Sequence, residues 1–489
     1  MRESCKLSGS EWTLDDLIAI EQTCAIHAKR YGLDTFPNQM EVISSEQMLD
    51  GYVSGGLPVN YGHWSFGKHF LIESAKYRSG ANSLAYEIVI NTNPCIAFLM
   101  EDNSLAMQAL VIPHACFGHN SFSKGNYLFR QWTQPDAILD YMLFARNYIA
   151  ECEERYGLER VEQTLDALHA LRDQGLDKYK RPSKLDSRKE RAEQAKRLFA
   201  AQETMRQAEY YSLVPHAAKA PAEAAGFPLN PEENLLYFIE KHAPKLEPWQ
   251  RELARIVRKI AQYFYPQRQT QVMNEGWATF WHHRLINDMY DAGEIDQGIL
   301  LECLHSHTNV IRQREYSGLN PYALGFAAWN EIKRVCDKPT AEDREYLPDI
   351  AGKDWLETFH GIMQDYRDES FLLQFLTPKL VRDFKLMYVK TQEGLDHWAV
   401  NDTAGPEGFK SIRSQLSASY RLESAMPEIS VVRYAHDTDR KLVLHHHSYK
   451  GKRLAKSQAE QTLKHLRSLW GFGVTLETVD QDGRTLETY

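Results

Sequence analysis

The fold is decided within residues 85–120, which read AYEIVINTNPCIAFLMEDNSLAMQALVIPHACFGHN. Two short, mainly apolar runs typical of strands, 85–91 and 95–101, flank a Thr-Asn-Pro segment, and this pattern is typical of a β-hairpin. A helical run follows from Ser104 toward His119 and is interrupted by Pro113. A hairpin beside a helix in a chain that otherwise has helical periodicity predicts an α+β fold that is mostly α-helical.

Apolar residues recur at three- and four-residue steps through most of the remaining chain, and this spacing predicts helices. Thr13 caps the first of them, and Pro135 begins a long helical region. Further helices are expected at 248–265, 271–290, 295–305, 321–336, 354–365 and 378–388.

The pattern of apolar residues changes from mainly helical to mixed strand and helix after about residue 390. Two alternating runs, an amphipathic run and two more short runs predict a ββαββ module; they cover 429–434, 441–447, 457–470, 473–479 and 484–489. We therefore expect a mainly helical domain over 1–389 and a small α/β domain over 390–489. A charged and Pro-rich stretch at about 177–233 is interpreted as an insertion in the helical domain.

Composition narrows the class of protein. The 489 residues include 57 Lys+Arg and 66 Asp+Glu, a formal net charge of −9, which disfavours a general nucleic-acid binder. The basic stretch 433–470 is interpreted as a solvated face.

None of the seven cysteines forms a CxxC pair, and neither a leader peptide nor an apolar run of about 18 residues is visible. These features predict a reduced, cytoplasmic protein without membrane insertion.

His114 and His119 are the first candidate site. Two imidazoles on one helix indicate a metal site, but they are five residues apart instead of four as in HExxH. Five residues of α-helix separate two side chains by about 140°, whereas a π-type turn would bring them together. Pro113 and Gly118 favour such an irregularity. The alternative is two polar residues at a helix end.

Glu275 is the second candidate, within MNEGWATFWHH at 273–283. Its aromatic neighbours predict a buried helix, and a buried carboxylate must be paired, hydrogen-bonded or bound to a metal. One alternative is a hydrogen-bonded core Glu. The other is a metal site of two His and one Glu, the donor set of catalytic zinc with an open fourth position. We predict a divalent metal, zinc, on His114, His119 and Glu275. Ala115 stands where HExxH has its general base.

Other residues are candidates for the missing acid–base role. Glu151 or Glu154, on the helix after Pro135, or His282 is predicted to act as the base. His305 and His307 are candidates for oxyanion stabilisation or for an acid near the metal. The alternative for these two is a polar helix end favoured by the helix dipole. No nucleotide-binding loop, dinucleotide fingerprint or serine-hydrolase elbow is present, so the sequence gives no support for nucleotide hydrolysis or serine-hydrolase chemistry. No cofactor-binding residues other than the metal ligands are predicted.

Several long blocks resemble the stage V sporulation protein R (SpoVR) family, in its non-sporulating proteobacterial branch. The resemblance extends over about 10–475 and is carried in order by HACFGHNSFSKGNYLFRQW (114–132), QVMNEGWATFWHH (271–283), LHSHTNV (304–310), SGLNPYALGF (317–326) and PDIAGKDWLET (348–358). It implies a role in spore cortex formation in spore-forming relatives. In non-sporulating bacteria it implies a stationary-phase and nutrient-stress response beside a serine-kinase-like protein and a von Willebrand-type-domain protein.

A second likeness concerns chemistry. A hairpin, a helix with paired His and a later EGWA helix resemble zincin-like metallopeptidases, which implies ligand roles for His114, His119 and Glu275. The departures from the zincin-like pattern are the five-residue spacing of the two His and Ala115 in place of the catalytic Glu.

Two functions follow as hypotheses. The first is a metal-dependent hydrolase acting on an amide in a peptide or peptidoglycan fragment. The alternative is a non-catalytic regulatory or scaffold protein acting with a serine-kinase-type partner.

Overall fold

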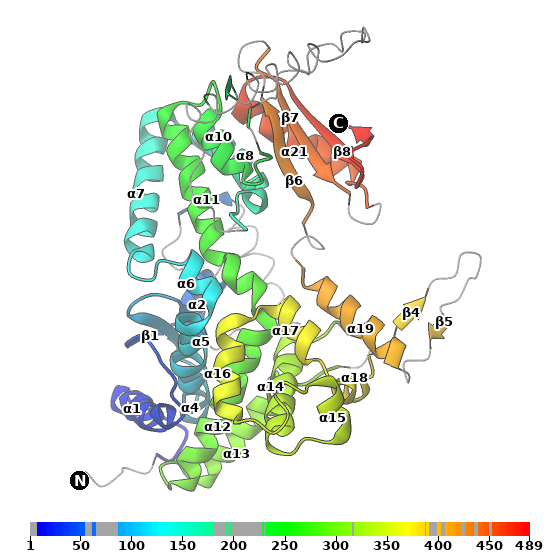
Figure 1. Cartoon of the computed structure of the whole chain (residues 1–489). Helices are drawn as coiled ribbons and strands as arrows, with labels where there is room; N and C mark the ends of the chain where they lie inside the picture. Colours follow the sequence, from blue (N-terminus) through cyan, green and yellow to red (C-terminus); the bar gives the residue numbers. More distant parts are fainter. Residues whose placement is uncertain are drawn as a thin grey trace. The chain divides into compact units, whose positions relative to one another are not determined.

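A computed structural model of the chain describes residues 7–53, 61–64, 87–178, 227–228, 230–314, 317–386, 388–390, 399–401, 406–421, 426–434, 439–448 and 452–489, together with four isolated helical positions between 192 and 199 (Figure 1). Most of the predicted insertion at 177–233 and the first two residues of the predicted strand 85–91 lie outside this set. The chain divides into two compact units: residues 1–147 and 265–424 form the first, and residues 148–264 and 425–489 form the second. The predicted domains, 1–389 and 390–489, are regions expected to fold independently. The two compact units do not test this, so the predicted domain boundary stays a prediction.

The predicted hairpin is confirmed in the first unit. Strand β2 (Glu87–Ile90) pairs antiparallel with β3 (Cys95–Met100). An additional strand, β1 (Asn38–Ile43), pairs parallel with β3, which gives a sheet in the order β1-β3-β2. The inward positions of β3 are buried and join the main apolar core.

The helix after the hairpin changes its winding at the two histidines. Ser104 caps α4 (Leu105–Ile112), and the chain then continues as the π-helix η1 (Pro113–His119) into α5 (Asn120–Gly125). Proline has no N–H to donate to the preceding turn, so the regular α-helical hydrogen-bond pattern is interrupted at this point. The wide turn that the five-residue spacing required is therefore present.

Helix α12 (Gln271–Asp291) is the centre of the first unit. It packs on η1, on α14 (Pro321–Asp337), on α13 (Gln297–Val310) and on α1 (Leu14–Arg30). Trp277 and Trp281 of α12 and Trp329 of α14 are completely buried. Their indole rings pack edge to face, and this aromatic cluster forms the middle of the core.

Smaller elements complete the first unit. They are α2 (Ser45–Val53), α6 (Tyr127–Trp132), α15 (Ala341–Tyr346), α16 (Trp355–Asp365), α17 (Asp368–Phe375), α18 (Pro378–Asp383), the two-stranded pair β4 (Tyr388–Lys390) and β5 (Ala399–Asn401), and α19 (Pro406–Ser419). Two long helices, α7 (Ile138–Tyr156) and α11 (Pro248–Gln269), each contribute residues to both units.

The second unit contains the predicted ββαββ module. Strands β6 (Glu428–Tyr434), β7 (Leu442–His447), β8 (Val474–Val479) and β9 (Thr485–Thr488) form a sheet in this order. The parallel pair β7–β8 is joined through α21 (Lys456–Trp470), as a parallel connection requires. The other elements of the unit are α8 (Leu158–Ala170), the short η2 (Arg172–Gln174) and α10 (Leu235–His242).

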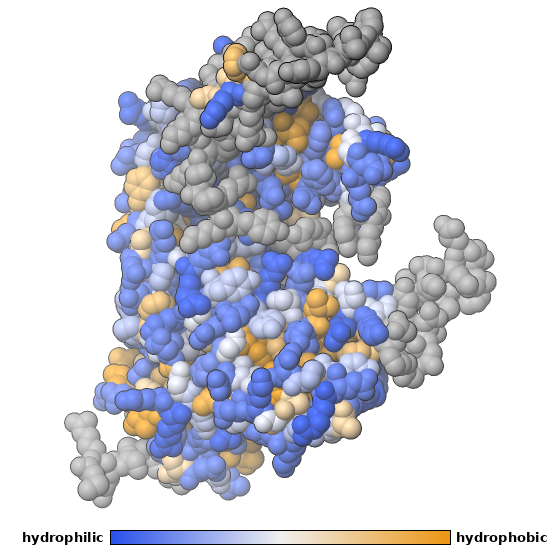
Figure 2. Space-filling view, in the orientation of Figure 1, coloured by the Kyte–Doolittle hydropathy of each residue, from blue (hydrophilic) through white to orange (hydrophobic). Residues whose placement is uncertain are grey.

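These elements confirm the α+β, mostly helical fold class. On the face drawn in Figure 2, hydrophilic side chains predominate and apolar side chains occur in small groups, which is ordinary for a protein surface. In the part of the chain that the structure describes, no helix combines the length and apolar character needed to cross a bilayer.

Candidate metal centre

The π-helix η1 places the two predicted histidines side by side. The rings of His114 and His119 lie with their centroids 4.6 Å apart and their planes at 89°. Their side chains are only 6% and 13% exposed. Gly118, between them, allows η1 to lie directly on α12, since a Cβ at this position would come within 2.5 Å of the Cα of Ala278. Backbone contact between the two helices thus sets the position of both rings.

A hydrogen bond donated by the Nδ1 atom of each ring fixes its orientation. His119 Nδ1 lies 3.0 Å from the side-chain oxygen of Asn274, and an amide oxygen only accepts. We therefore assign a proton to His119 Nδ1, so the neutral form of the ring has its lone pair on Nε2. His114 Nδ1 lies 2.9 Å from Nδ1 of His282. With His114 as the donor, its Nε2 also has a free lone pair.

His282 continues into a chain of three buried imidazoles. Its Nε2 lies 2.8 Å from Nδ1 of His307, and both rings are at most 5% exposed. Burial, with neighbouring imidazoles adding to it, holds the pKa of His282 well below its usual value and lowers that of His307 to about 4. Both rings are therefore neutral at pH 7. Neutral imidazoles form a head-to-tail chain in which each ring donates one hydrogen bond and accepts another.

Glu275 faces both Nε2 atoms from α12. Its Oε2 lies 3.5 Å from His119 Nε2 and 3.8 Å from His114 Nε2. Burial opposes ionisation, but the positive charge of His119 and His114 in their protonated forms outweighs it and holds the pKa of Glu275 below its usual value. Glu275 in turn raises the pKa of His119 against the effect of burial. Among the described residues the buried Oε2 of Glu275 has no hydrogen-bond partner. These distances exceed an ordinary hydrogen bond of about 2.7–3.2 Å. The carboxylate of Glu275 and the two imidazoles therefore face one another without direct hydrogen bonds.

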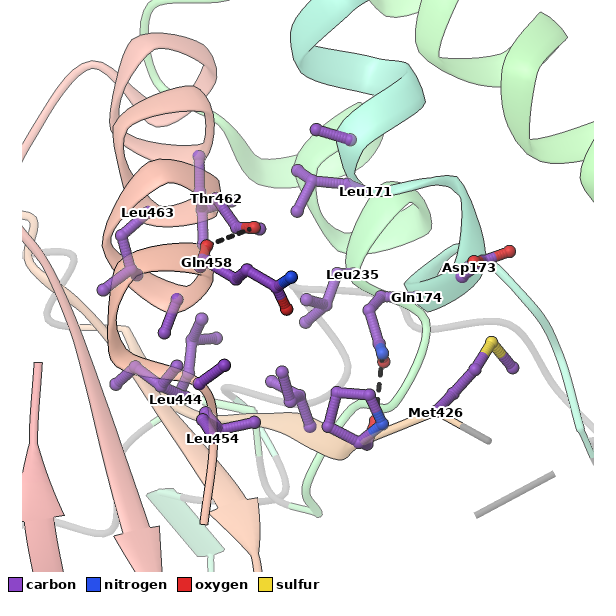
Figure 3. A pocket seen from close by; sticks show the side chains of 17 residues that line it. Leu171, Asp173, Gln174, Leu235, Met426, Leu444, Leu454, Gln458, Thr462 and Leu463 are labelled. Atoms are coloured by element: carbon purple, nitrogen blue, oxygen red, sulfur yellow. Dashed lines mark hydrogen bonds between the residues drawn. The ribbon is translucent and has the colours of Figure 1, made fainter. Parts of the chain in front are cut away.

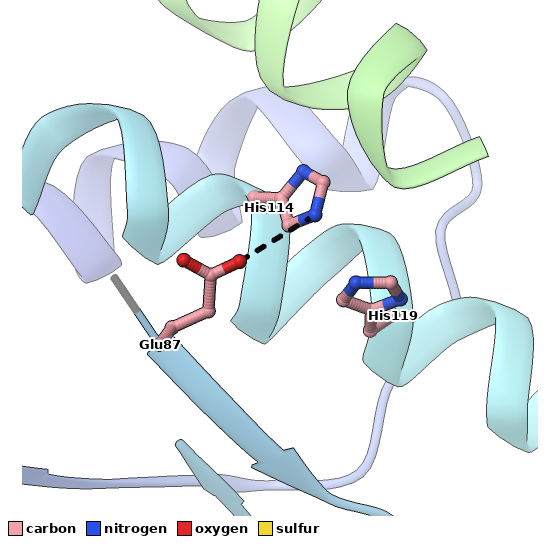
Figure 4. A group of neighbouring side chains, drawn as sticks. All are labelled: Glu87, His114 and His119. Carbon is pink, nitrogen blue, oxygen red and sulfur yellow. Dashed lines mark ion pairs between the residues drawn. The ribbon is translucent and has the colours of Figure 1, made fainter. Parts of the chain in front are cut away.

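Glu87, the first residue of β2, completes the cluster. Its Oε1 lies 3.6 Å from His114 Nε2, and Figure 4 shows its carboxylate pointing from the strand toward this ring. Burial raises the pKa of Glu87, although His114 and His119 oppose the shift. Glu87 was not among the residues predicted from the sequence. The signal was present, because Glu87 is the one charged residue in AYEIVIN (85–91), the first strand of the predicted hairpin.

The donor set fits a divalent ion. Two overlapping groups of side chains contain the paired His. In the first, the ligand atoms of Glu87, His114 and His119 all lie within 4.8 Å of one another. In the second, Glu275 takes the place of Glu87. Two ligands of a tetrahedral zinc ion with bonds of about 2.1 Å are about 3.4 Å apart. The 3.5 and 3.8 Å separations between Glu275 Oε2 and the two imidazole nitrogens are close to this value. The Glu275 oxygen, which has no hydrogen-bond partner, and the Nε2 atoms of the two imidazoles are the groups that such an ion would bind.

Four consecutive residues of α12, 274–277, each have a separate role in the structure. Asn274 holds His119, and Glu275 faces the imidazoles. Gly276 lies where a Cβ would approach the backbone of Gly325 within 2.3 Å, so α12 and α14 cross in backbone contact. The Trp277 indole donates to Ser121 Oγ at 3.0 Å, which ties α12 to α5.

A buried carboxylate fixes the start of α12. Asp368 accepts the amides of Val272 and Met273 at 2.9 Å. Burial raises the pKa of Asp368 to about 7, against the effect of these amides.

The remaining predicted residues are placed as follows. His282 and His307 lie in the imidazole chain that starts at His114. His305 is exposed on α13, two residues before the buried His307. Glu151 is exposed on the part of α7 that belongs to the second unit. The acid–base roles predicted for these residues stay predictions.

Comparison with known proteins identifies relatives along almost the whole chain. Residues 11–425 match the family described as "SpoVR like protein", and residues 427–481 match "SpoVR-like C-terminal domain". The chain is 50% identical over 490 aligned positions to "Uncharacterized protein YcgB" of Escherichia coli (strain K12), an alignment that covers 99% of this chain and 96% of that protein. No solved structure matches the chain.

Proposed function

The chain belongs to the SpoVR family, and we propose that it is a zinc-dependent hydrolase of amide bonds in which His114, His119 and Glu275 hold the ion. The observation that carries this proposal is the convergence of two imidazole Nε2 atoms on one buried carboxylate oxygen, at 3.5 and 3.8 Å. The substrate class we propose is a peptide or peptidoglycan fragment, because the resemblance links spore-forming relatives to the peptidoglycan cortex.

Bound zinc would acidify a coordinated water and polarise the carbonyl of the substrate. The protein's part is to hold the ligands in place before the ion arrives. Asn274 and His282 each occupy the second nitrogen of a ligand ring, and partners of this kind fix the tautomer of a metal-binding histidine. Glu275 supplies the negative charge that two neutral imidazoles lack.

We assign the missing general base to Glu87, in place of the Glu that HExxH would put at position 115. Its carboxylate points from β2 toward His114, and its Oε1 lies 3.6 Å from Nε2 of this ring. A carboxylate there can accept a proton from an attacking water and return it to a leaving amine. The competing role for Glu87 is that of a further metal ligand.

Metal analysis of untagged, full-length protein tests the proposal. After exposure to zinc and removal of excess ion, the wild type is expected to retain about one zinc per chain. His114→Ala and Glu275→Gln should lose it, because each removes a ligand. The matched control is His305→Ala, which removes an exposed imidazole from α13 and should leave the content unchanged. Equal zinc in His114→Ala and the wild type would contradict the assignment, as would stoichiometric iron or manganese in place of zinc.

The role of Glu87 needs a second readout. If it is the base, Glu87→Gln keeps its zinc and loses cleavage of peptide or muropeptide amides by about 100-fold or more. If it is a ligand, the same variant binds zinc more weakly. Activity equal to the wild type in the zinc-loaded variant would contradict the base assignment.

The absence of a Glu after His114 favours a second candidate function. In it, the protein is a regulatory or scaffold component of the stationary-phase and nutrient-stress response in the cytoplasm, acting with the serine-kinase-like and von Willebrand-type-domain proteins that the resemblance implies. Affinity capture of the full-length chain from starved cells should then recover these partners from wild type and Glu275→Gln alike. A stress defect in Glu275→Gln with normal capture would favour the hydrolase.

A further inference from the structure

Three consecutive histidines, His445–His447, end strand β7 of the ββαββ module, and the metal centre of the first unit does not use them. Side chains of a strand alternate between the two faces of its sheet. Leu444 lines a cavity between the sheet and α21 (Figure 3), and the buried His446, two residues further on, shares this face. His446 Nδ1 lies 3.2 Å from the hydroxyl oxygen of Thr478. His445 and His447 therefore project from the face of the sheet away from α21.

The strands on either side of β7 add two carboxylates to this face. Glu477 of β8 lies directly opposite His445 in the parallel pair, and Glu428 of β6 lies directly opposite His447 in the antiparallel pair. Residues directly opposite one another project from the same face of a sheet. Imidazole and carboxylate groups are both ligands of divalent transition ions. Three neighbouring strands thus bring two groups of each kind to one face.

The contact between His445 and Glu477 leaves room for an ion. His445 Nε2 lies 3.6 Å from Glu477 Oε2, and the two side chains are 29% and 30% exposed. This separation is longer than an ordinary hydrogen bond of about 2.7–3.2 Å. Burial lowers the pKa of His445, although Glu477 opposes the shift, so this ring is neutral at pH 7. Two ligand atoms bonded to one ion at about 2.1 Å are at most about 4.2 Å apart, so this pair can share an ion.

The ring of His447 lies within reach of the same ion. Its centroid is 6.4 Å from that of His445, and the two ring planes are at 72°. A metal-bound imidazole has its centroid about 3.2 Å from the ion, so two rings on one ion have centroids at most about 6.4 Å apart. The observed distance is at this limit. Because His447 is exposed, a rotation of its side chain toward His445 brings the ring inside the limit.

A buried hydroxyl beside His445 also points to a ligand at this position. Ser430 of β6 lies directly opposite His445, so its side chain is on the same face. The residue is 2% exposed, and its Oγ has no hydrogen-bond partner among the described residues. Buried polar groups in proteins are ordinarily hydrogen-bonded. A water molecule that completes the coordination of an ion at His445 would supply the partner that Ser430 lacks.

We propose that His445, His447 and Glu477 form a second site, for an exchangeable divalent transition ion, with Glu428 as an additional acidic group beside it. Nitrogen and oxygen donors of this kind bind Cu²⁺ most tightly among the divalent first-row ions. The ligands are partly exposed and His447 must rotate to bind. The ion is therefore held less tightly than at the buried metal centre and is lost when excess ion is removed. This site does not depend on the proposed hydrolase activity.

Equilibrium dialysis of Cu²⁺ against the full-length His114→Ala/Glu275→Gln variant tests the proposal. This background removes two ligands of the buried centre, and about one bound Cu²⁺ per chain is expected in it. Addition of His445→Ala, His447→Ala or Glu477→Gln should in each case lower the affinity by about tenfold or more, because each change removes a ligand. If the background does not fold, wild-type protein with zinc at the buried centre takes its place.

Glu487→Gln is the matched control for the loss of a carboxylate. Glu487 lies on β9 directly opposite Thr478, which is opposite His446, so its side chain belongs to the face that α21 covers. This variant should bind Cu²⁺ as tightly as its parent. Equal weakening in Glu487→Gln and Glu477→Gln would overturn the proposed ligand set.

Electron paramagnetic resonance of the bound Cu²⁺ identifies its ligands. Nitrogen hyperfine coupling from two imidazoles is expected, and from one imidazole in His447→Ala. The proposal is overturned if no stoichiometric Cu²⁺ binds, or if the spectrum shows fewer than two imidazoles. It is also overturned if Glu477→Gln binds Cu²⁺ as tightly as its parent, since the two histidines would then hold an adventitious ion only.

Discussion

Replacing Gly276 by alanine tests the crossing of α12 and α14 that positions Glu275. A Cβ at this position would lie 2.3 Å from the carbonyl carbon and 2.5 Å from the Cα of Gly325. Both are backbone atoms, so no side-chain rotation can relieve the overlap. The helices must separate by roughly an ångström, because real Cβ contacts are essentially never closer than 3.0 Å.

The size of the effect follows from two opposing terms. Alanine is favoured over glycine inside a helix by about 1 kcal/mol. Overpacking of a tight core costs about 1–3 kcal/mol, and we take the upper end because the contact is between backbones. Gly276→Ala is therefore expected to lower the free energy of unfolding by about 2 kcal/mol. It should also weaken zinc binding, because residue 275 moves with the helix.

Gly361→Ala is the matched control. Gly361 lies inside α16 of the same unit, and a Cβ there meets no atom within 4 Å. This change should raise stability by about 0.5–1 kcal/mol through helix propensity alone. Urea unfolding followed by tryptophan fluorescence reports the core directly, since Trp277 and Trp329 are buried beside the crossing. Equal midpoints for the two variants would refute the proposed backbone contact.

Three further predictions concern the hydrogen bonds around the site and one ion pair. His282→Phe keeps a ring but no nitrogen beside His114, and zinc affinity by competitive chelator titration should fall about 10–100-fold. Asn274→Leu removes the acceptor for His119 and should weaken zinc by a similar factor, while wild-type affinity in either variant would contradict the tautomer assignment. Hydrogen bonds from Arg334 hold the pKa of buried Asp343 well below its usual value. Asp343 therefore binds fewer protons in the folded than in the unfolded state, so its stabilisation is present above about pH 4 and lost as the pH falls further. Acid unfolding of Asp343→Asn should be less pH-dependent in this range than that of the wild type, and identical profiles would refute the role of the pair.

Much of the fold could be predicted from local sequence signals. The Thr13 cap, the hairpin at residues 85–101, the helix of Glu275 and the ββαββ module all depend on periodicity and turn residues that are close in the chain. The π-helix could also be predicted, because only a wide turn lets histidines five residues apart face one site.

The remainder depends on contacts between distant segments. Strand β1 pairs with β3 across more than fifty residues, and its own sequence does not reveal this partner. Glu87 was missed for the same reason, because a single charged residue in a strand ordinarily faces solvent. Only the packing of β2 against η1 brings it to His114. The imidazole chain through His282 to His307 likewise needs α12 and α13 to be neighbours.

The most direct test of the metal centre is anomalous diffraction at the zinc edge from crystals of the full-length, zinc-loaded protein. We predict one strong peak at about 2.0–2.2 Å from Nε2 of His114, Nε2 of His119 and a carboxylate oxygen of Glu275. A zinc-loaded crystal with no peak among these three atoms, or with its strong peak at other residues, would contradict the proposed metal centre.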